Sequence, residues 1–593
     1  MNGNGRRAAM ACAVTAMAAA CAAAPAGAAQ RAADTVLRNG IVYTGKGKQR
    51  VAAVAIRGGR IVAAGGDRRV SRLAGRGTRV VNLRGRTVMP GIHDGHNHAL
   101  GGGENLFSCD LRFRSMTIAE ARDEIAVCLE RTSELEPDGW MVVRNLFIEA
   151  MQPPGARPTK ADLDSLSTRR PIIVESTSHH SSWVNSRALE IAGVTAATAD
   201  PTGGTIQRDA QGNPTGLLFD AASGLVSSKI PPDTMALKLR KARAALAELA
   251  AKGVTSVFVP GGDEETLEIW DRLRRAGGLT VRITQAIRVE PDEIDTPEKL
   301  AAEIRRLNAL RRKYQRGNVR VSAVKMFGDG LIGFPAQTGA LLAPYWVNVG
   351  TRENPDMRDI GTHRGRYFLE GLIERAATAF DKAGWQIQVH CMGDACTRRT
   401  LDGYAAARRA NGRSDLRHSI THLQVIDRAD IPRFKRLGVV ASMSLQWARR
   451  DSYELVTDGP YLGPERFARV FATRELREAG ATIAGGSDWP VDPLAPFTQF
   501  ESAVTRTGEV NPEFGIFPGA LNPDQALTRW DSFRIHTANT AFQLHQERRT
   551  GTLEPGKQAD LIVLDRDVMR VPVKRISDTK VRTTMLGGKV VHE

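Results

Sequence analysis

Eight short apolar runs, rich in β-branched residues, recur between residues 89 and 488, with helix-like stretches between them. Alternating strands and helices are typical of a parallel sheet, because parallel strands need a crossover connection. Eight repeats predict an α/β fold built on a TIM-like (β/α)8 barrel. The runs cover 89–98, 253–259, 281–287, 319–327, 385–390, 418–422, 439–444 and 481–488, and clear helical patterns cover 236–252, 299–313 and 370–384.

The first and second runs are separated by about 150 residues. A crossover between neighbouring parallel strands needs far fewer. We therefore expect an inserted α/β subdomain at about 101–235, and we assign the strand-like run 170–175 to it.

Short strands with glycine turns occupy both ends of the chain, at 29–88 and 546–593. Chain termini often lie close together, so we expect one small β-sandwich built from both ends, flanking a barrel domain at 89–545. The hairpin signals between apolar runs are Asn39-Gly40, Gly58-Gly59 and Gly587-Gly588.

Residues 1–28 have the pattern of a secretory signal peptide. Arg6-Arg7 precede an alanine-rich apolar run, and Ala26-Gly27-Ala28 offers a small-residue cleavage site. The run is too short and too weakly apolar for a membrane span. We expect an exported protein, periplasmic or secreted, with Cys21 as a candidate lipid anchor and homo-oligomerisation left open.

The 593 residues are 42% hydrophobic and 25% charged, as in a folded soluble protein, and carry a formal charge of +17. Lysine and arginine are scattered rather than clustered, which argues against a nucleic-acid partner. Four cysteines follow residue 28, too few for a disulfide framework in so large a chain. One bond, Cys109–Cys128, is conceivable, and we expect Cys391 to be buried filler.

Metal-competent side chains gather at the ends of the predicted barrel strands. His96 and His98 end the first run, and residues i and i+2 of a strand point to the same side. Barrel enzymes carry their chemistry at this carboxyl end, so we expect one shared site. The other members are Lys325 near the end of the fourth run, His390 and His422 at the ends of the fifth and sixth, and Asp488 at the end of the eighth.

These residues resemble the amidohydrolase superfamily, and more closely its family 3 branch, over nearly the whole chain after residue 28. The matching segments are Pro90-Gly91-x-x-Asp94-x-His96-x-His98, Lys325-Met326-Phe327-x-Asp329-Gly330, His390-x-x-Gly393-Asp394, His422-x-Gln424, Gly486-Ser487-Asp488-Trp489-Pro490, His180-Ser181-Ser182-Trp183 and Gly551–Asp560. The chain departs from the branch at Thr421, where a glutamate is usual, and at Ser178-His179, where Asp-Gly is common.

The resemblance implies that Lys325 reacts with carbon dioxide and becomes a carbamate bridging two divalent metal ions. His96, His98 and Asp488 would hold one ion, and His390 and His422 the other; such ligands suit zinc. Asp488 would be the general base for metal-activated hydroxide. His180 is a further catalytic candidate, and Gln424 and Trp489 are candidates for substrate binding.

The resulting hypothesis is a metal-dependent hydrolase that cleaves an amide-type C–N bond, other than a peptide bond, in a small molecule. One alternative is a mononuclear deaminase on the same barrel, with Lys325 an ordinary residue. Another is an exported ligand-binding protein on an inactive barrel, because barrels host many functions.

Overall fold

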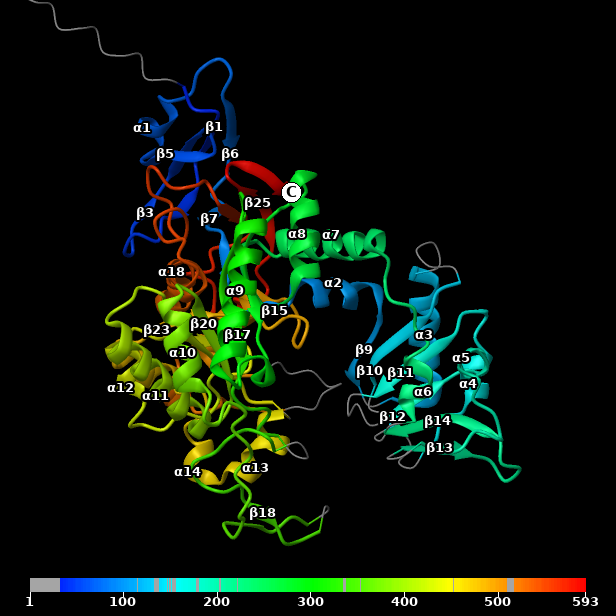
Figure 1. The fold of residues 1–593 in the computed structure, drawn as a ribbon. Coiled ribbons are helices and arrows are strands. Elements are labelled where there is room, and N and C mark those ends of the chain that lie inside the picture. Colours follow the sequence, from blue (N-terminus) through cyan, green and yellow to red (C-terminus); the bar gives the residue numbers. More distant parts are fainter. Residues whose placement is uncertain are drawn as a thin grey trace, which may run out of the picture.

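A central sheet of eight parallel strands confirms the predicted barrel (Figure 1). The computed structural model describes residues 32–593, apart from 115, 133–137, 147, 149–150, 152–155, 177–180, 202–203, 221, 334–336, 352–353, 452 and 509–516. In spatial order the strands are β8 (Ile92–Asp94), β15 (Val254–Gly262), β16 (Arg282–Arg288), β17 (Val319–Phe327), β20 (Gln386–Cys391), β21 (Ser419–His422), β22 (Val440–Met443) and β23 (Thr482–Gly485).

The two edge strands of this sheet approach each other, so the barrel is nearly closed. Gly95 N donates to Gly485 O at 2.6 Å, and Asp488 N donates to His96 O at 2.8 Å. These bonds join the segments that follow β8 and β23, which places the carboxyl ends of the first and last strands together.

Some of the helices between the strands begin at residues whose side chains cap free backbone N–H groups. Thr296 accepts from Lys299 N at the start of α9 (Pro297–Tyr314), with Pro297 in the first turn. Asp263 accepts from Thr266 N at the start of α8 (Glu264–Arg275). The outer layer also contains α7 (Met235–Ala251), α10 (Ile373–Lys382), α11 (Asp394–Asn411), α12 (Ile431–Leu437), α15 (Thr473–Glu478), α16 (Pro496–Thr505), α17 (Arg529–Arg534) and α18 (Thr540–Gln543).

Strands from both ends of the chain form one six-stranded sheet, as predicted for the composite sandwich. Its order is β26 (Lys589–His592), β25 (Val581–Leu586), β24 (Leu561–Leu564), β7 (Thr87–Pro90), β2 (Ile41–Tyr43) and β3 (Arg50–Val51). A second sheet holds β5 (Arg60–Gly65), β4 (Ala53–Arg57), β1 (Thr35–Arg38) and β6 (Arg79–Asn82). Only Gly91 separates β7 from β8, so the terminal sheet leads directly into the barrel.

The predicted hairpin at Asn39-Gly40 is wrong. Asn39 has a positive φ of 56°, as a tight turn requires, but β1 and β2 on either side of it belong to different sheets. Asp67 holds the turn by accepting from Asn39 N at 2.7 Å. The hairpins at Gly58-Gly59 and Gly587-Gly588 are confirmed, because β4 pairs antiparallel with β5, and β25 with β26.

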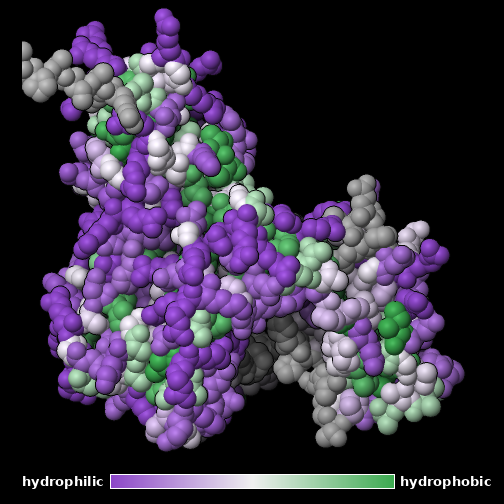
Figure 2. All heavy atoms as spheres, turned by 45° about the horizontal axis from the view of Figure 1, so that its top comes forward, coloured by the Kyte–Doolittle hydropathy of each residue, from purple (hydrophilic) through white to green (hydrophobic). Residues whose placement is uncertain are grey.

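A third body lies to one side of the barrel and holds the predicted insertion (Figure 1). Its sheet, called here the inserted sheet, has the order β13 (Gly204–Arg208), β14 (Pro214–Asp220), β12 (Ser181–Val184), β11 (Ile172–Ser176), β10 (Met141–Leu146) and β9 (Cys109–Arg114). The predicted strand 170–175 is β11. Helix α2 (Ala99–Phe107) leads from the barrel to β9, and α3 (Ile118–Thr132), α4 (Lys160–Asp164), α5 (Ser186–Ala192) and α6 (Ser223–Ser227) accompany the sheet. Figure 2 shows two lobes, the larger one mostly covered by hydrophilic side chains.

Two disulfides link the four described cysteines. Cys109 of β9 bonds Cys128 of α3, as the sequence allowed. Cys391, which was expected only to fill space in the core, is buried as expected but forms a disulfide with Cys396 of α11. The prediction missed this bond because five residues of separation carry no pairing signal of their own.

Two expectations concern the first residues of the chain and membrane association. The predicted signal peptide, with Cys21, lies outside the described residues. Within the described part of the chain, no helix is both long enough and apolar enough to cross a membrane.

Candidate metal centre

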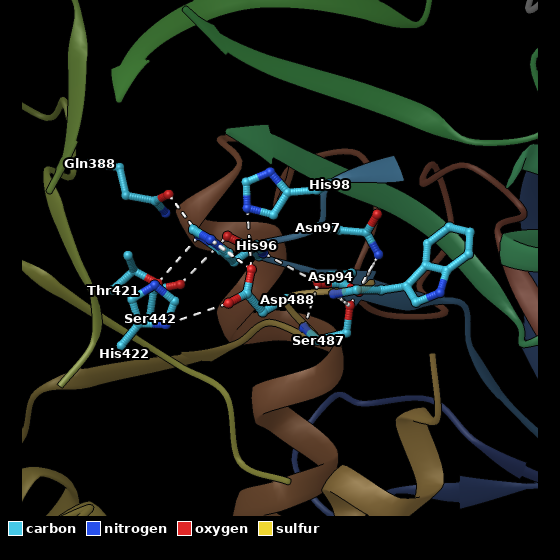
Figure 3. A network of polar contacts seen from close by, with 12 residues as sticks. Asp94, His96, Asn97, His98, Gln388, Thr421, His422, Ser442, Ser487 and Asp488 are labelled. Carbon is cyan, nitrogen blue, oxygen red and sulfur yellow. Dashed lines mark hydrogen bonds and ion pairs between the residues drawn. The ribbon is translucent and has the colours of Figure 1, made fainter. Parts of the chain in front are cut away.

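The carboxylate of Asp488 lies at the centre of a buried cluster of histidines at the carboxyl end of the barrel. Its Oδ1 lies 3.2 Å from the Nε2 atoms of both His96 and His98, and its Oδ2 lies 3.9 Å from His422 Nδ1. Figure 3 shows the carboxylate pointing between these three imidazoles. The ring centroids of His390 and His422 are 4.4 Å apart, so His390 completes the cluster.

His96 and His98 reach this point in a different way from the one predicted. Strand β8 ends at Asp94, so both histidines lie in the loop before α2 rather than within a strand. Asp94 fixes that loop: it accepts from His96 N, from Asn97 Nδ2 at 3.0 Å and from Ser487 N at 2.9 Å. One buried carboxylate therefore ties the segment after β8 to the segment that carries Asp488.

The atoms of the cluster fit a bound zinc ion. Ligands about 2.0–2.1 Å from a tetrahedral zinc lie roughly 3.3 Å from one another, close to the 3.2 Å separations around Asp488. His422 Nδ1 and Asp488 Oδ1 are buried and have no hydrogen-bond partner among the described residues. Buried polar atoms without a partner are costly, and a cation would satisfy both.

Neighbouring polar groups select the nitrogen that His96 and His390 present. His96 Nδ1 lies 2.9 Å from Gln388 Oε1 and 3.3 Å from Thr421 Oγ1. An amide oxygen accepts only, so Nδ1 carries the proton and Nε2 keeps its lone pair toward Asp488. His390 Nε2 lies 3.3 Å from Gly330 O, which leaves its Nδ1 as the free nitrogen.

Lys325 is fully buried beside these residues, with a side chain about as inaccessible as any in the core. It forms no ion pair with a described carboxylate; its Nζ lies 5.0 Å from the ring centroid of Phe327. Burial lowers the pKa of Lys325 to about 7, against the attraction of Asp488. A neutral amine is therefore present near neutral pH, and only the neutral form is a nucleophile.

Burial also keeps His96, His390 and His422 uncharged. It lowers the pKa of His96 to about 4 and that of His390 to about 3, and it moves the pKa of His422 in the same direction. Neutral imidazoles around a carboxylate are a ready set of metal ligands.

A second group of potential metal ligands is engaged in a disulfide and in hydrogen bonds to the backbone. Asp329, Cys391 and Cys396 lie close together, but the two cysteines share a disulfide. Asp329 accepts backbone N–H groups from Ala340, Met392 and Gly393 at 2.9 Å each. Its role is therefore to hold the loops after β17 and β20.

The structure describes two of the three remaining predicted site residues. Gln424 is buried, and its amide donates to Glu454 and Asp458. Trp489 is 7% exposed and packs on α2, where a Cβ added to Gly102 would lie 2.3 Å from the indole. Both substrate-binding roles stay predictions, and His180 lies outside the described residues.

Sequence reasoning missed two members of the site. Gln388, which orients His96, precedes His390 by two residues on β20, so strand periodicity could have identified it. Trp447, beyond β22, stacks on His422 with ring centroids 5.3 Å apart, and no motif marks it.

Comparison with known proteins gives consistent matches. A family model described as "Amidohydrolase family" matches residues 79–592. YtcJ of Bacillus subtilis is 27% identical over 521 residues, covering 86% of this chain and 90% of YtcJ. The N-substituted formamide deformylase of Arthrobacter pascens is 27% identical over 527 residues, covering 86% of this chain and 89% of that enzyme. The crystal structure of an uncharacterized metal-dependent hydrolase from Pyrococcus furiosus superposes with a TM-score of 0.68 at 22% identity, over 90% of this chain and all of that chain.

Proposed function

Because the chain belongs to the amidohydrolase family, in its family 3 branch, we propose that it is a metal-dependent hydrolase of a small molecule. The bond cleaved is an amide-type C–N bond other than a peptide bond. The observation that carries this proposal is the buried Asp488 carboxylate facing His96, His98 and His422 with unpartnered ligand atoms.

Two zinc ions are the proposed cofactors. His96, His98 and Asp488 would hold one ion, and His390 and His422 the other. When bound, such ions polarise a carbonyl group and lower the pKa of a water from about 15.7 towards about 7.

Lys325 is proposed to join the two ligand sets as a carbamate. Its neutral amine attacks carbon dioxide, an N–C bond forms, and the proton released from nitrogen leaves to solvent. The product carries a negative charge where the ammonium form would repel cations. Support comes from the complete burial of Lys325 and from its lack of an ion pair with any described carboxylate.

Asp488 is proposed to move the proton. Its Oδ1 is buried and has no hydrogen-bond partner among the described residues, so this oxygen can accept a proton from the attacking water. It then passes this proton to the nitrogen that leaves as an amine. Gln388 keeps the Nε2 atom of His96 turned toward Asp488 during these steps.

We also propose that the protein acts outside the cytoplasm. The pattern of residues 1–28 supports this, and so do the two disulfides, because such bonds persist in oxidising compartments.

The direct test is a panel of N-formyl, N-acyl and cyclic amides offered to zinc-loaded protein, with amine release as the measurement. Hydrolysis of at least one member, abolished by a chelator and restored by zinc, is expected. Ammonia release from an amino-substituted ring, with one metal per chain, would favour the mononuclear deaminase. Failure of every substrate with metal bound would favour a ligand-binding protein.

A further inference from the structure

A cavity rich in arginine opens at the amino-terminal end of the barrel strands. Its volume is about 370 Å³. We call it the arginine cavity, defined by Arg311, Arg316, Arg320, Arg549, Ser322 and Gly384. These residues come from the end of α9, the start of β17, the turn before β20 and the segment before the C-terminal strands.

The charges of this cavity are not neutralised by the protein. Among the described residues, no carboxylate lies within ion-pair distance of any of the four guanidinium groups, and none lines the cavity. Other arginines at this end of the barrel are paired: Arg282 with Asp560 and Arg417 with Glu547. Four like charges facing one cavity repel each other unless an anion joins them.

Arg311 is held in place with donor capacity to spare. Its guanidinium stacks on Trp385, 3.5 Å from the ring centroid, and its Nη2 donates to Gly384 O at 3.0 Å. Its Nε is buried and has no partner among the described residues. Burial, together with the charge of Arg320, lowers the pKa of Arg311 to about 10, so it remains a cation at neutral pH.

Arg320 lies against the same space. Its Nε donates to Ser322 Oγ at 2.9 Å. Burial and the charge of Arg417 lower the pKa of Arg320, and Glu547, which opposes them, accepts hydrogen bonds from Arg417 at 2.8 and 3.0 Å. Among the described residues, no carboxylate forms an ion pair with Arg320.

The arginine cavity is separate from the metal centre. Arg320 begins β17 and Lys325 lies near its other end, and five residues of strand span roughly 16 Å. Substrate held at the carboxyl end of the barrel cannot reach it through the packed barrel interior.

We propose that the arginine cavity binds an oxyanion of the phosphate class, either inorganic phosphate or the phosphate group of a small monoester. Guanidinium groups form paired hydrogen bonds with such oxygens, and the volume leaves room for the anion with bound water or a small substituent. The bound anion cross-links α9, β17 and the C-terminal segment at Arg549.

Binding is tested by calorimetric titration of inorganic phosphate into the full chain at low ionic strength and neutral pH, with sodium chloride of equal ionic strength as the reference. Saturable binding at one site, together with a higher melting temperature in phosphate, is expected. Arg311→Gln and Arg549→Gln should each weaken binding about tenfold or more, because each removes hydrogen bonds to a charged group. Arg549 is exposed, so its variant tests the proposal even if loss of the Arg311 stack disturbs folding.

The matched control is Arg312→Gln, which removes the same charge from the neighbouring, exposed position of α9 outside the cavity. Binding in this variant should stay within about twofold of the wild type. Equal losses in Arg312→Gln and Arg549→Gln, or no saturable phosphate binding, would overturn the proposal. Vesicles containing phosphatidylglycerol form a second arm: capture of the protein by them, with no binding of free phosphate, would also overturn it. No step of this test depends on hydrolytic activity.

Discussion

The barrel and the inserted sheet are both built from strands with helices between them, yet the buried histidines among the described residues all belong to the barrel. In the inserted sheet, alternate residues of β11 enter two apolar cores: Ile172 and Val174 face one, and Ile173 faces the other. In the barrel, the strand ends converge because the sheet nearly closes. Closure of the sheet, rather than strand–helix alternation itself, therefore assembles the metal centre.

The two regions are also held together differently. The loops of the barrel are tied by buried carboxylates, Asp94 and Asp329, which accept several N–H groups each. The inserted sheet relies on apolar packing and on the bond between Cys109 and Cys128. We therefore expect substitutions at the barrel site to change catalysis and substitutions in the inserted sheet to change local stability.

The largest effect is expected for Asp488→Asn. It removes the charge between the histidines and the proposed proton acceptor, so hydrolysis should fall by roughly 10³-fold or more, measured as kcat/KM on any substrate the panel identifies. Asp402→Asn, on the exposed face of α11, makes the same change of charge and should keep full activity. Comparable activity in the two variants would contradict the assignment of the site to the barrel.

Lys325→Ala should come next. Activity and metal affinity should each fall about 100-fold, because the anionic bridge is lost. Short carboxylic acids should restore part of the activity by occupying the space of the carbamate, while the same acids leave a Lys382→Ala control unchanged. Full activity of Lys325→Ala without added acid would remove the bridging role.

The disulfides allow a matched test of the two regions. Opening Cys109–Cys128, which spans 19 residues, by changing both to serine should cost about 3 kcal/mol of local stability. Hydrogen exchange should then speed up in peptides of the inserted sheet while peptides of β17 and β20 stay protected. Opening Cys391–Cys396, which spans five residues, should cost about 2 kcal/mol and act on the barrel instead. Equal loss of protection in both regions would show that they unfold as one unit.

The smallest effect concerns acid. Burial lowers the pKa of His536 in the folded barrel to about 4, from 6.5 for an exposed histidine, so the unfolded chain binds more protons between these values. Folding stability is therefore intact above pH 6.5 and falls as the pH drops toward 4. His536→Gln should reduce the loss of unfolding free energy between pH 7 and pH 5 by on the order of 1 kcal/mol, as urea titrations would measure. An unchanged pH dependence would contradict the buried, neutral state of this ring.

The same acid titration should distinguish the barrel from the inserted sheet by the pH at which each loses protection from hydrogen exchange. The described residues of the inserted sheet and its helices contain no histidine. Acid should therefore release hydrogen-exchange protection in barrel peptides before it does so in this region.

Much of the barrel was predictable, because its strands are short, largely apolar runs, and the proposed ligands lie in or just after β8, β17, β20, β21 and β23. All eight strands lie where these runs predict them. The histidines could be grouped before any geometry was known, since strand ends share one face of a barrel.

What the sequence could not reveal depends on contacts between distant segments. Asn39-Gly40 has the residues of a hairpin turn, yet it connects two different sheets. The reason is that β1 pairs with β4, whereas β2 pairs with β7. The burial of Gln424 against Glu454 and Asp458, and the arginine cavity, likewise arise from residues far apart in the chain.

The central claim is that His96, His98, His390, His422 and Asp488 converge on divalent metal. Its most direct test is the metal content of purified protein, dialysed against zinc and then against buffer, and counted by mass spectrometry. We predict two zinc ions per wild-type chain and none retained by the double variant His96→Ala, Asp488→Ala. Equal zinc in the wild type and the double variant, or none in either, would contradict the account.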